Sequence, residues 1–236
     1  MMKRLFCLLA VLAASAGFVS CESPIDGPEP ETDQDYISVS QNGNTVTFKY
    51  TSGTHTYTLD EGEQTSTLTF SHFPSTLNEF KTLRERLLGK SRPGTVALCL
   101  LSFEMYRRNQ SVGEQCVRLI NTSANATITI PRLKEKLDQP YLVASYLKGA
   151  TQSNNYTPNE PYVLTFLWND NPNVVQGEYS SSYAGKVYHY YAVWNGDGKR
   201  DATVLSPDDG SEVIVHGCGN LVLGVPTVGG WTDTLK

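Results

Sequence analysis

The sequence is poor in basic side chains and lacks the motifs that mark common enzymes. Its 19 Lys and Arg residues are outnumbered by 24 Asp and Glu, which gives a formal net charge of −5 at pH 7. A nucleic-acid-binding surface needs excess positive charge to neutralise phosphates, so no nucleic acid partner is expected. The chain contains no CxxC or HExxH metal motif, no GxSxG nucleophile motif and no glycine-rich phosphate loop. We therefore predict no cofactor and assign no catalytic residue.

Long hydrophobic runs are also lacking, apart from a short one at the N-terminus. Residues 1–20 read MMKRLFCLLAVLAASAGFVS, with two cations, an apolar run from Leu5 to about Ala14, and small residues after it. The run is shorter than the ~20 residues of a membrane-spanning helix and is typical of a secretory signal peptide. Cleavage after Ala16 would release a soluble exported protein, and this alternative stays open.

A single cysteine, Cys21, separates the leader from a segment rich in acids and prolines. Residues 21–35 contain six acids, three prolines and no basic residue, so this segment is predicted to be an extended, solvated tether. Residues 18–21, Phe-Val-Ser-Cys, resemble the lipobox of bacterial lipoproteins, in which the cysteine is acylated and becomes the first residue. The resemblance implies a lipid (palmitate) on Cys21 and an outer-membrane lipoprotein of the Bacteroidetes type, facing the periplasm or the cell surface.

Two segments with alternating apolar and polar residues flank a central helical region. Residues 36–72 alternate around turns at Gly43, Gly53 and Gly62, which predicts an antiparallel β-meander. Further strands are expected at residues 162–168, 186–194, 202–206, 212–216 and 221–225, with residues 202–216 forming a hairpin.

Helices are expected between these two sets of strands. The first covers residues 77–88 after a cap at Ser75 or Thr76, the second, buried, runs from Pro93 to about Arg107, and the third ends near Ile120. Residues 127–137 are predicted to form a short strand and a helical turn.

This order of elements predicts an α+β fold with an N-terminal antiparallel β-meander, about three central helices and a C-terminal antiparallel sheet. The predicted organisation is a signal peptide (1–20), a tether (21–35), a β-meander (36–72) and an α+β domain of unknown function (73–236).

The segment YLVASYLKGATQSNNYTPNEPY, residues 141–162, is the most distinctive in the chain. It resembles the pattern YLxxSYxxGATPxNGYTPxxPY of an uncharacterised domain family of Bacteroides and clostridial proteins. Gln152 and Asn155 depart from the pattern, which has proline and glycine there. The resemblance implies a fold but no activity. Residues 149–161 are interpreted either as a binding loop or as a structural connection in which Tyr156 is a buried peg.

Aromatic residues cluster late in the chain and supply the candidate ligand contacts. Rings of this kind stack on sugars or clamp peptides. Tyr188 and Tyr190 point to one face of their strand while His189 and Tyr191 point to the other, so half of these rings are expected in the core. The candidate ligand-binding residues are Tyr156, Trp168, Tyr188, Tyr190 and Trp194.

Cysteine and histidine offer little further chemistry. His216 and Cys218 are two residues apart, but zinc needs a third and a fourth ligand, so no metal site is predicted. An odd number of cysteines, Cys99, Cys116 and Cys218, remains after Cys21, and a disulfide between Cys99 and Cys116 is left open.

The sequence favours a lipid-anchored cell-envelope protein that binds or scaffolds a glycan or protein partner without catalysis. A hydrolase acting on a glycan or peptide polymer is the alternative.

Overall fold

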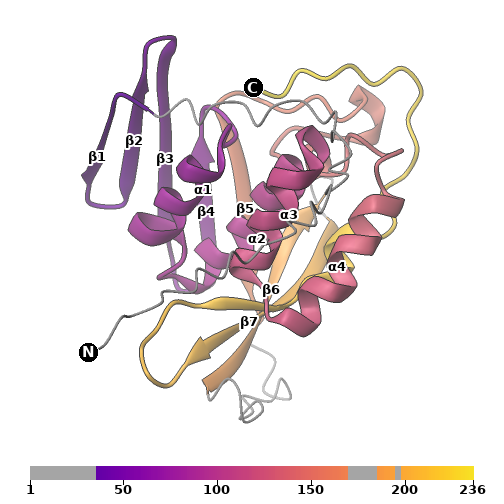
Figure 1. Cartoon of the computed structure of the whole chain (residues 1–236). Helices are drawn as coiled ribbons and strands as arrows, with labels where there is room; N and C mark the ends of the chain where they lie inside the picture. The colour runs from indigo at the N-terminus through magenta and orange to yellow at the C-terminus, as the bar shows by residue number, and fades with distance from the viewer. Residues whose placement is uncertain (1–35, 170–184, 195–197) are drawn as a thin grey trace, which may run out of the picture. The chain divides into compact units, whose positions relative to one another are not determined.

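An antiparallel sheet of eight strands, hydrogen-bonded in sequence order, organises the described part of the chain (Figure 1). The computed structural model describes residues 36–169, 185–194 and 198–236, so the predicted leader, the tether and Cys21 lie outside the described residues. The strands are β1 (Ser38–Asn42), β2 (Thr45–Tyr50), β3 (Gly53–Glu61), β4 (Thr65–Phe70), β5 (Tyr162–Trp168), β6 (Gly185–Trp194), β7 (Gly198–Pro207) and β8 (Ile214–Gly217).

Alternation along the strands decides which face of the sheet is buried. In β2, Val46 and Phe48 are fully buried, whereas Thr45 and Thr47, which alternate with them, are only half-buried. Because successive side chains of a strand point to opposite faces, one face carries the core and the other is rich in threonine. Helices lie together on the apolar face (Figure 1).

The helices come between β4 and β5 in the chain. They are α1 (Leu77–Leu83), a π-helical turn η1 (Arg84–Leu88), α2 (Arg92–Arg108), α3 (Gln110–Ile120) and α4 (Ser123–Glu135), with short 3-10 turns η2 (Ala144–Tyr146), η3 (Gln152–Asn154) and η4 (Gly219–Val222). Side chains of Thr76 and Ser91 accept hydrogen bonds from the first turns of α1 and α2. The predicted starts of these two helices are therefore confirmed. The fold is α+β.

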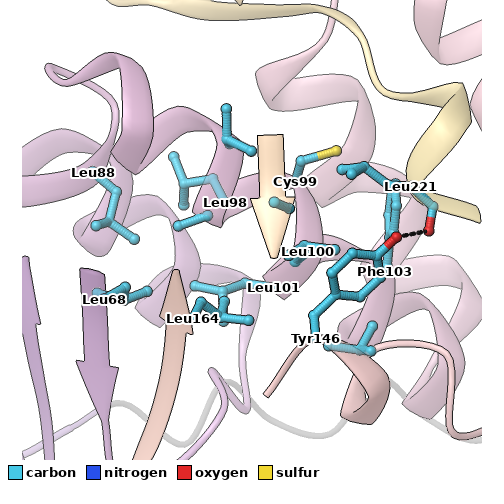
Figure 2. Close-up of a cluster of buried hydrophobic side chains, with 14 of the residues drawn as sticks. Leu68, Leu88, Leu98, Cys99, Leu100, Leu101, Phe103, Tyr146, Leu164 and Leu221 are labelled. Atoms are coloured by element: carbon cyan, nitrogen blue, oxygen red, sulfur yellow. Dashed lines mark hydrogen bonds between the residues drawn. The ribbon is translucent and has the colours of Figure 1, made fainter. Parts of the chain in front are cut away.

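Helix α2 is the centre of the core, as its apolar sequence predicts. Every residue from Pro93 to Tyr106 is buried. Figure 2 shows Leu101 of α2 close to Leu164 of β5, with Leu68 of β4 near them. Burial of apolar area on this scale is the main stabilising term of such a domain, at about 25 cal/mol per Å².

Two predicted strands are wrong. The Thr and Ile residues that alternate within residues 127–137 predict a short strand, but residues 127–135 belong to α4 and residues 136–137 form a turn. The Thr122 side chain caps this helix, and Ala126, Thr129 and Leu133 form its buried stripe, so tertiary packing overrides the β-propensity of the segment. The strand predicted at residues 221–225 does not form, because Leu221 and Val222 belong to η4. The Leu221 carbonyl oxygen accepts a hydrogen bond of 2.6 Å from the Tyr146 hydroxyl (Figure 2).

Strand pairing crosses the predicted boundary between residues 72 and 73. The register of β4 against β5 runs from Thr65 opposite Leu167 to Phe70 opposite Tyr162. Residues 36–72 and the later strands therefore share one sheet. This continuity brings the β3–β4 turn next to the end of β5.

Candidate ligand-binding site

A polar cavity of about 200 Å³ opens where the β3–β4 turn, the start of α2, the end of β5 and β6 meet. Its walls come from segments that are up to 129 residues apart in sequence, from Glu61 to Tyr190. The lining residues are Glu61, Gly62, Glu63, Gln64, Ser66, Arg92, Pro93, Trp168 and Tyr190. Charged, amide and hydroxyl groups dominate this wall, with two aromatic rings among them.

The register of β5 against β6 places the rings. Trp168 is directly opposite Tyr190, and Tyr188 is two residues earlier on the same face of β6. The Trp168 ring meets Tyr188 and Tyr190 edge-on, with centroid separations of 5.7 and 5.5 Å. Edge-to-face packing of this kind fixes ring orientation and contributes about 0.5–1.5 kcal/mol per pair.

Arg92, the first residue of α2, places a cation against two of these rings. Its guanidinium carbon lies 4.8 Å from the centroid of Trp168 and 4.0 Å from that of Tyr188. Both distances fall within the ~6 Å range of cation–π attraction. Within the part of the chain that the structure describes, no side chain forms an ion pair with Arg92. Rings therefore hold this guanidinium, and its N–H donors remain for other partners.

The opposite wall is the turn between β3 and β4. The Trp168 backbone N–H donates to the Gln64 carbonyl oxygen at 2.9 Å, which ties this turn to the end of β5. Gly62 N–H donates to Thr65 O at 3.0 Å, and a Cβ at Gly62 would lie 2.7 Å from that oxygen, so the tight turn requires glycine. The turn exposes the carboxylates of Glu61 and Glu63 at the cavity.

Tyr190 is the least exposed ring of the site. Burial raises the pKa of its hydroxyl to about 12, Glu61 adds to the rise, and Arg92 opposes it. The phenol therefore keeps its proton at neutral pH and can donate a hydrogen bond. Together the site offers a fixed cation, two carboxylates and neutral donors around a small polar space.

One protein-family model matches most of the chain. The model describes a domain of unknown function, DUF6935, and it matches residues 72–223. The chain belongs to the DUF6935 family. No curated protein and no solved structure matches the chain. The DUF6935 region contains Arg92, Trp168, Tyr188 and Tyr190, whereas Glu61 and Glu63 precede it.

Two candidate residues of the DUF6935 region lie away from the cavity. Tyr156 is fully buried, stacks on Tyr141 at 5.2 Å, and donates its hydroxyl hydrogen to Pro226 O at 3.1 Å. It therefore anchors its loop as a structural peg, the second of the two interpretations of residues 149–161. The Trp194 indole N–H donates to Ser145 Oγ at 3.0 Å.

A second polar cluster lies under the N-terminal strands and around Glu79, which has no exposed surface. Its carboxylate accepts hydrogen bonds from His55 Nδ1 at 3.1 Å, Tyr57 Oη at 3.0 Å and the Ser75 backbone N at 2.9 Å. Burial raises the pKa of Glu79, but the hydrogen bonds from His55 and Ser75 outweigh this effect and hold the pKa below its ordinary value. The cluster fastens α1 to β3.

The thiols do not form the disulfide that was left open. Cys99, Cys116 and Cys218 are buried and free, and the Cys116 thiol contacts Met105 Sδ at 3.5 Å. No group of three or more His, Cys, Asp or Glu side chains suited to a metal ion occurs within residues 36–169, 185–194 and 198–236. In the same ranges, no helix is both long and apolar enough to cross a membrane.

Sequence reasoning selected three of the rings and missed the polar half of the site. Trp168, Tyr188 and Tyr190 stand out because aromatic residues are dense in this stretch. Arg92 carries no comparable signal, since an arginine before Pro-Gly at a helix start is unremarkable. Glu61 is similarly typical of an exposed turn.

Proposed function

We propose that the protein is a lipid-anchored cell-envelope protein whose DUF6935 domain binds a saccharide unit in the cavity beside Arg92, without catalysis. The observation that carries this proposal is the convergence on one polar cavity of Trp168, Tyr190 and the Arg92 guanidinium, which has no ion-pair partner among the described residues. Sugars present apolar C–H faces and many hydroxyls, which aromatic rings and charged hydrogen-bonding groups complement.

The arrangement of β-meander, central helices and later strands supports this proposal. Each of the three parts supplies a wall: Glu61 comes from the meander, Arg92 from the helices and Tyr190 from the later strands. A volume of about 200 Å³ is smaller than the ~300–1,000 Å³ of pockets that hold drug-sized ligands. The cavity therefore fits one small unit, either free or at the end of a polymer.

Binding is tested with Trp168→Ala and with Tyr191→Ala as its matched control. Tyr191 is on the same strand as Tyr190 but points to the opposite face of the sheet. A panel of immobilised oligosaccharides should retain the wild-type protein and the control, whereas Trp168→Ala should lose about tenfold or more in affinity, because stacked aromatics dominate such interfaces. Equal retention of all three proteins would contradict the site assignment.

Attachment through Cys21 is tested separately from binding. The proposal predicts that Cys21→Ala abolishes labelling by a fatty-acid probe and moves the protein to the soluble fraction. Two or more acyl chains hold a protein at a membrane far more firmly than one. Labelling that persists in Cys21→Ala would remove Cys21 as the anchor, whereas a wild type that is neither labelled nor bound to membranes would favour cleavage after Ala16.

Hydrolysis is the second candidate function, and one observation favours it. Glu61 and Glu63 line the same cavity, and glycosidases commonly use two carboxylates. Both carboxylates are exposed, however, whereas a general acid is typically held in an apolar environment. Release of reducing ends from a bound oligosaccharide by the wild type, but not by Glu61→Gln or Glu63→Gln, would establish hydrolysis.

A further inference from the structure

Arg92 differs from Arg107, Arg108 and Arg118 in what holds its guanidinium. Arg107 and Arg108 both pair with the buried Glu104, and Arg118 pairs with Glu114 one helical turn away. Arg92 instead lies against Trp168 and Tyr188, and no carboxylate within the described residues lies within ion-pairing distance of it.

This environment prepares Arg92 to bind an anion. A guanidinium presents a planar fork of donors that matches a carboxylate in bidentate geometry. Two rings already restrict the orientation of the fork, so less side-chain entropy is lost when a ligand binds. The fork lines the cavity, where a ligand atom can reach it.

The other walls restrict what the rest of the ligand can be. The Glu61 and Glu63 carboxylates only accept hydrogen bonds, so they need a ligand with several donors facing the β3–β4 turn. The buried Ser66 hydroxyl and the protonated Tyr190 hydroxyl add groups that can donate. A hydroxyl-rich ring that carries one carboxylate satisfies both walls at once.

We propose that the ligand is an acidic saccharide, a hexuronic acid unit whose carboxylate binds Arg92 while its hydroxyls donate to Glu61 and Glu63. This inference rests on the proposed function, because it names the class of saccharide for the same cavity. It makes Arg92 the specificity-determining residue and Trp168 and Tyr190 the residues that hold the ring.

Titration calorimetry on the full-length protein tests the inference with four probes. These are an oligogalacturonate, a neutral galacto-oligosaccharide of equal length, a chitosan oligomer of equal length, and an oligoglutamate peptide. The wild type should bind the oligogalacturonate about tenfold to a hundredfold more tightly than the neutral oligomer, the range expected for a hydrogen bond to a charged group. Added salt should lower the affinity for the oligogalacturonate and leave the affinity for the neutral oligomer unchanged.

Substitution of Arg92 separates this inference from the proposed function. Arg92→Gln should remove the preference, so that the acidic and neutral oligomers bind with equal affinity, whereas Arg86→Gln, which makes the same charge change on an exposed arginine outside the cavity, should keep the preference. If Arg92→Gln does not fold, Arg92→Lys provides the test. Lysine keeps the positive charge but not the planar fork of donors, so this variant should lose most of the preference for the acidic oligomer.

Each contrary outcome has a distinct meaning. Equal affinity for acidic and neutral oligomers, or preference for chitosan, overturns the inference and leaves saccharide binding intact. Oligoglutamate binding that depends on Arg92 and exceeds oligogalacturonate binding replaces the saccharide with an acidic peptide. Binding of none of the three oligosaccharides overturns the proposed function and the inference with it.

Discussion

Replacing Glu79 by alanine is expected to cause a large loss of stability. The carboxylate has no exposed surface and accepts hydrogen bonds from His55 Nδ1, the Tyr57 hydroxyl and the Ser75 backbone N–H. Glu79→Ala leaves these donors without their acceptor under the sheet. A buried donor that loses its partner costs about 1–3 kcal/mol, and Glu79 is the acceptor for three such donors.

We therefore expect the free energy of unfolding to fall by about 3–5 kcal/mol in Glu79→Ala. With a urea m-value of about 2 kcal/mol/M for a domain of this kind, the unfolding midpoint should fall by about 2 M. Urea titration followed by tryptophan fluorescence measures this change, because three tryptophans, Trp168, Trp194 and Trp231, lie within the described residues.

A control and a milder variant sharpen the test. Glu85→Ala removes an exposed carboxylate from η1 and should change stability by no more than about 0.5 kcal/mol. Glu79→Gln keeps one acceptor oxygen and should lose less stability than Glu79→Ala. A loss below 1 kcal/mol in Glu79→Ala would refute the account of this cluster, since the donors would then have found other partners.

Two further predictions concern acid and packing. Burial lowers the pKa of His72 from 6.5, and hydrogen bonds lower the pKa of Glu79 from 4.5. Near these pH values the unfolded chain therefore binds more protons than the folded protein does. The urea midpoint should fall as the pH drops below 6.5 and again as it drops below 4.5. A midpoint that rises on acidification would contradict this prediction. Gly113→Ala places a Cβ 2.1 Å from the Tyr106 Cα, so the urea midpoint of this variant should fall by an amount equivalent to about 2 kcal/mol or more. The control is Gly229→Ala, whose added Cβ meets nothing within 4 Å and should leave the midpoint nearly unchanged.

Local sequence signals predicted most elements because the energetics of those elements are local or periodic. Thr76 caps α1, and the unbroken apolar run of α2 matches a helix buried on all sides. In α4 the alternating Thr and Ile residues indicate a strand, and only packing of Ala126 and Leu133 against the core shows why the segment is helical.

The site illustrates the limit of such signals. Trp168 and Tyr190 were selected because aromatic residues are dense there, and their neighbourhood follows from strand pairing. Glu61 and Arg92 reach the same cavity only because β4 pairs with β5 across the intervening helices. Neither residue belongs to a local pattern, so a single sequence contains no sign that they meet.

The indole N–H resonance of Trp168 gives the most direct test of the central claim, that the cavity beside Arg92 binds a saccharide. Trp194, whose indole N–H is already bonded to Ser145, serves as an internal control in the same spectrum. Trp168→Phe identifies the resonance. On titration with oligogalacturonate, the Trp168 resonance should shift and saturate while that of Trp194 stays in place. A Trp168 resonance that does not move, with shifts at Trp194 or Trp231 instead, would contradict the account.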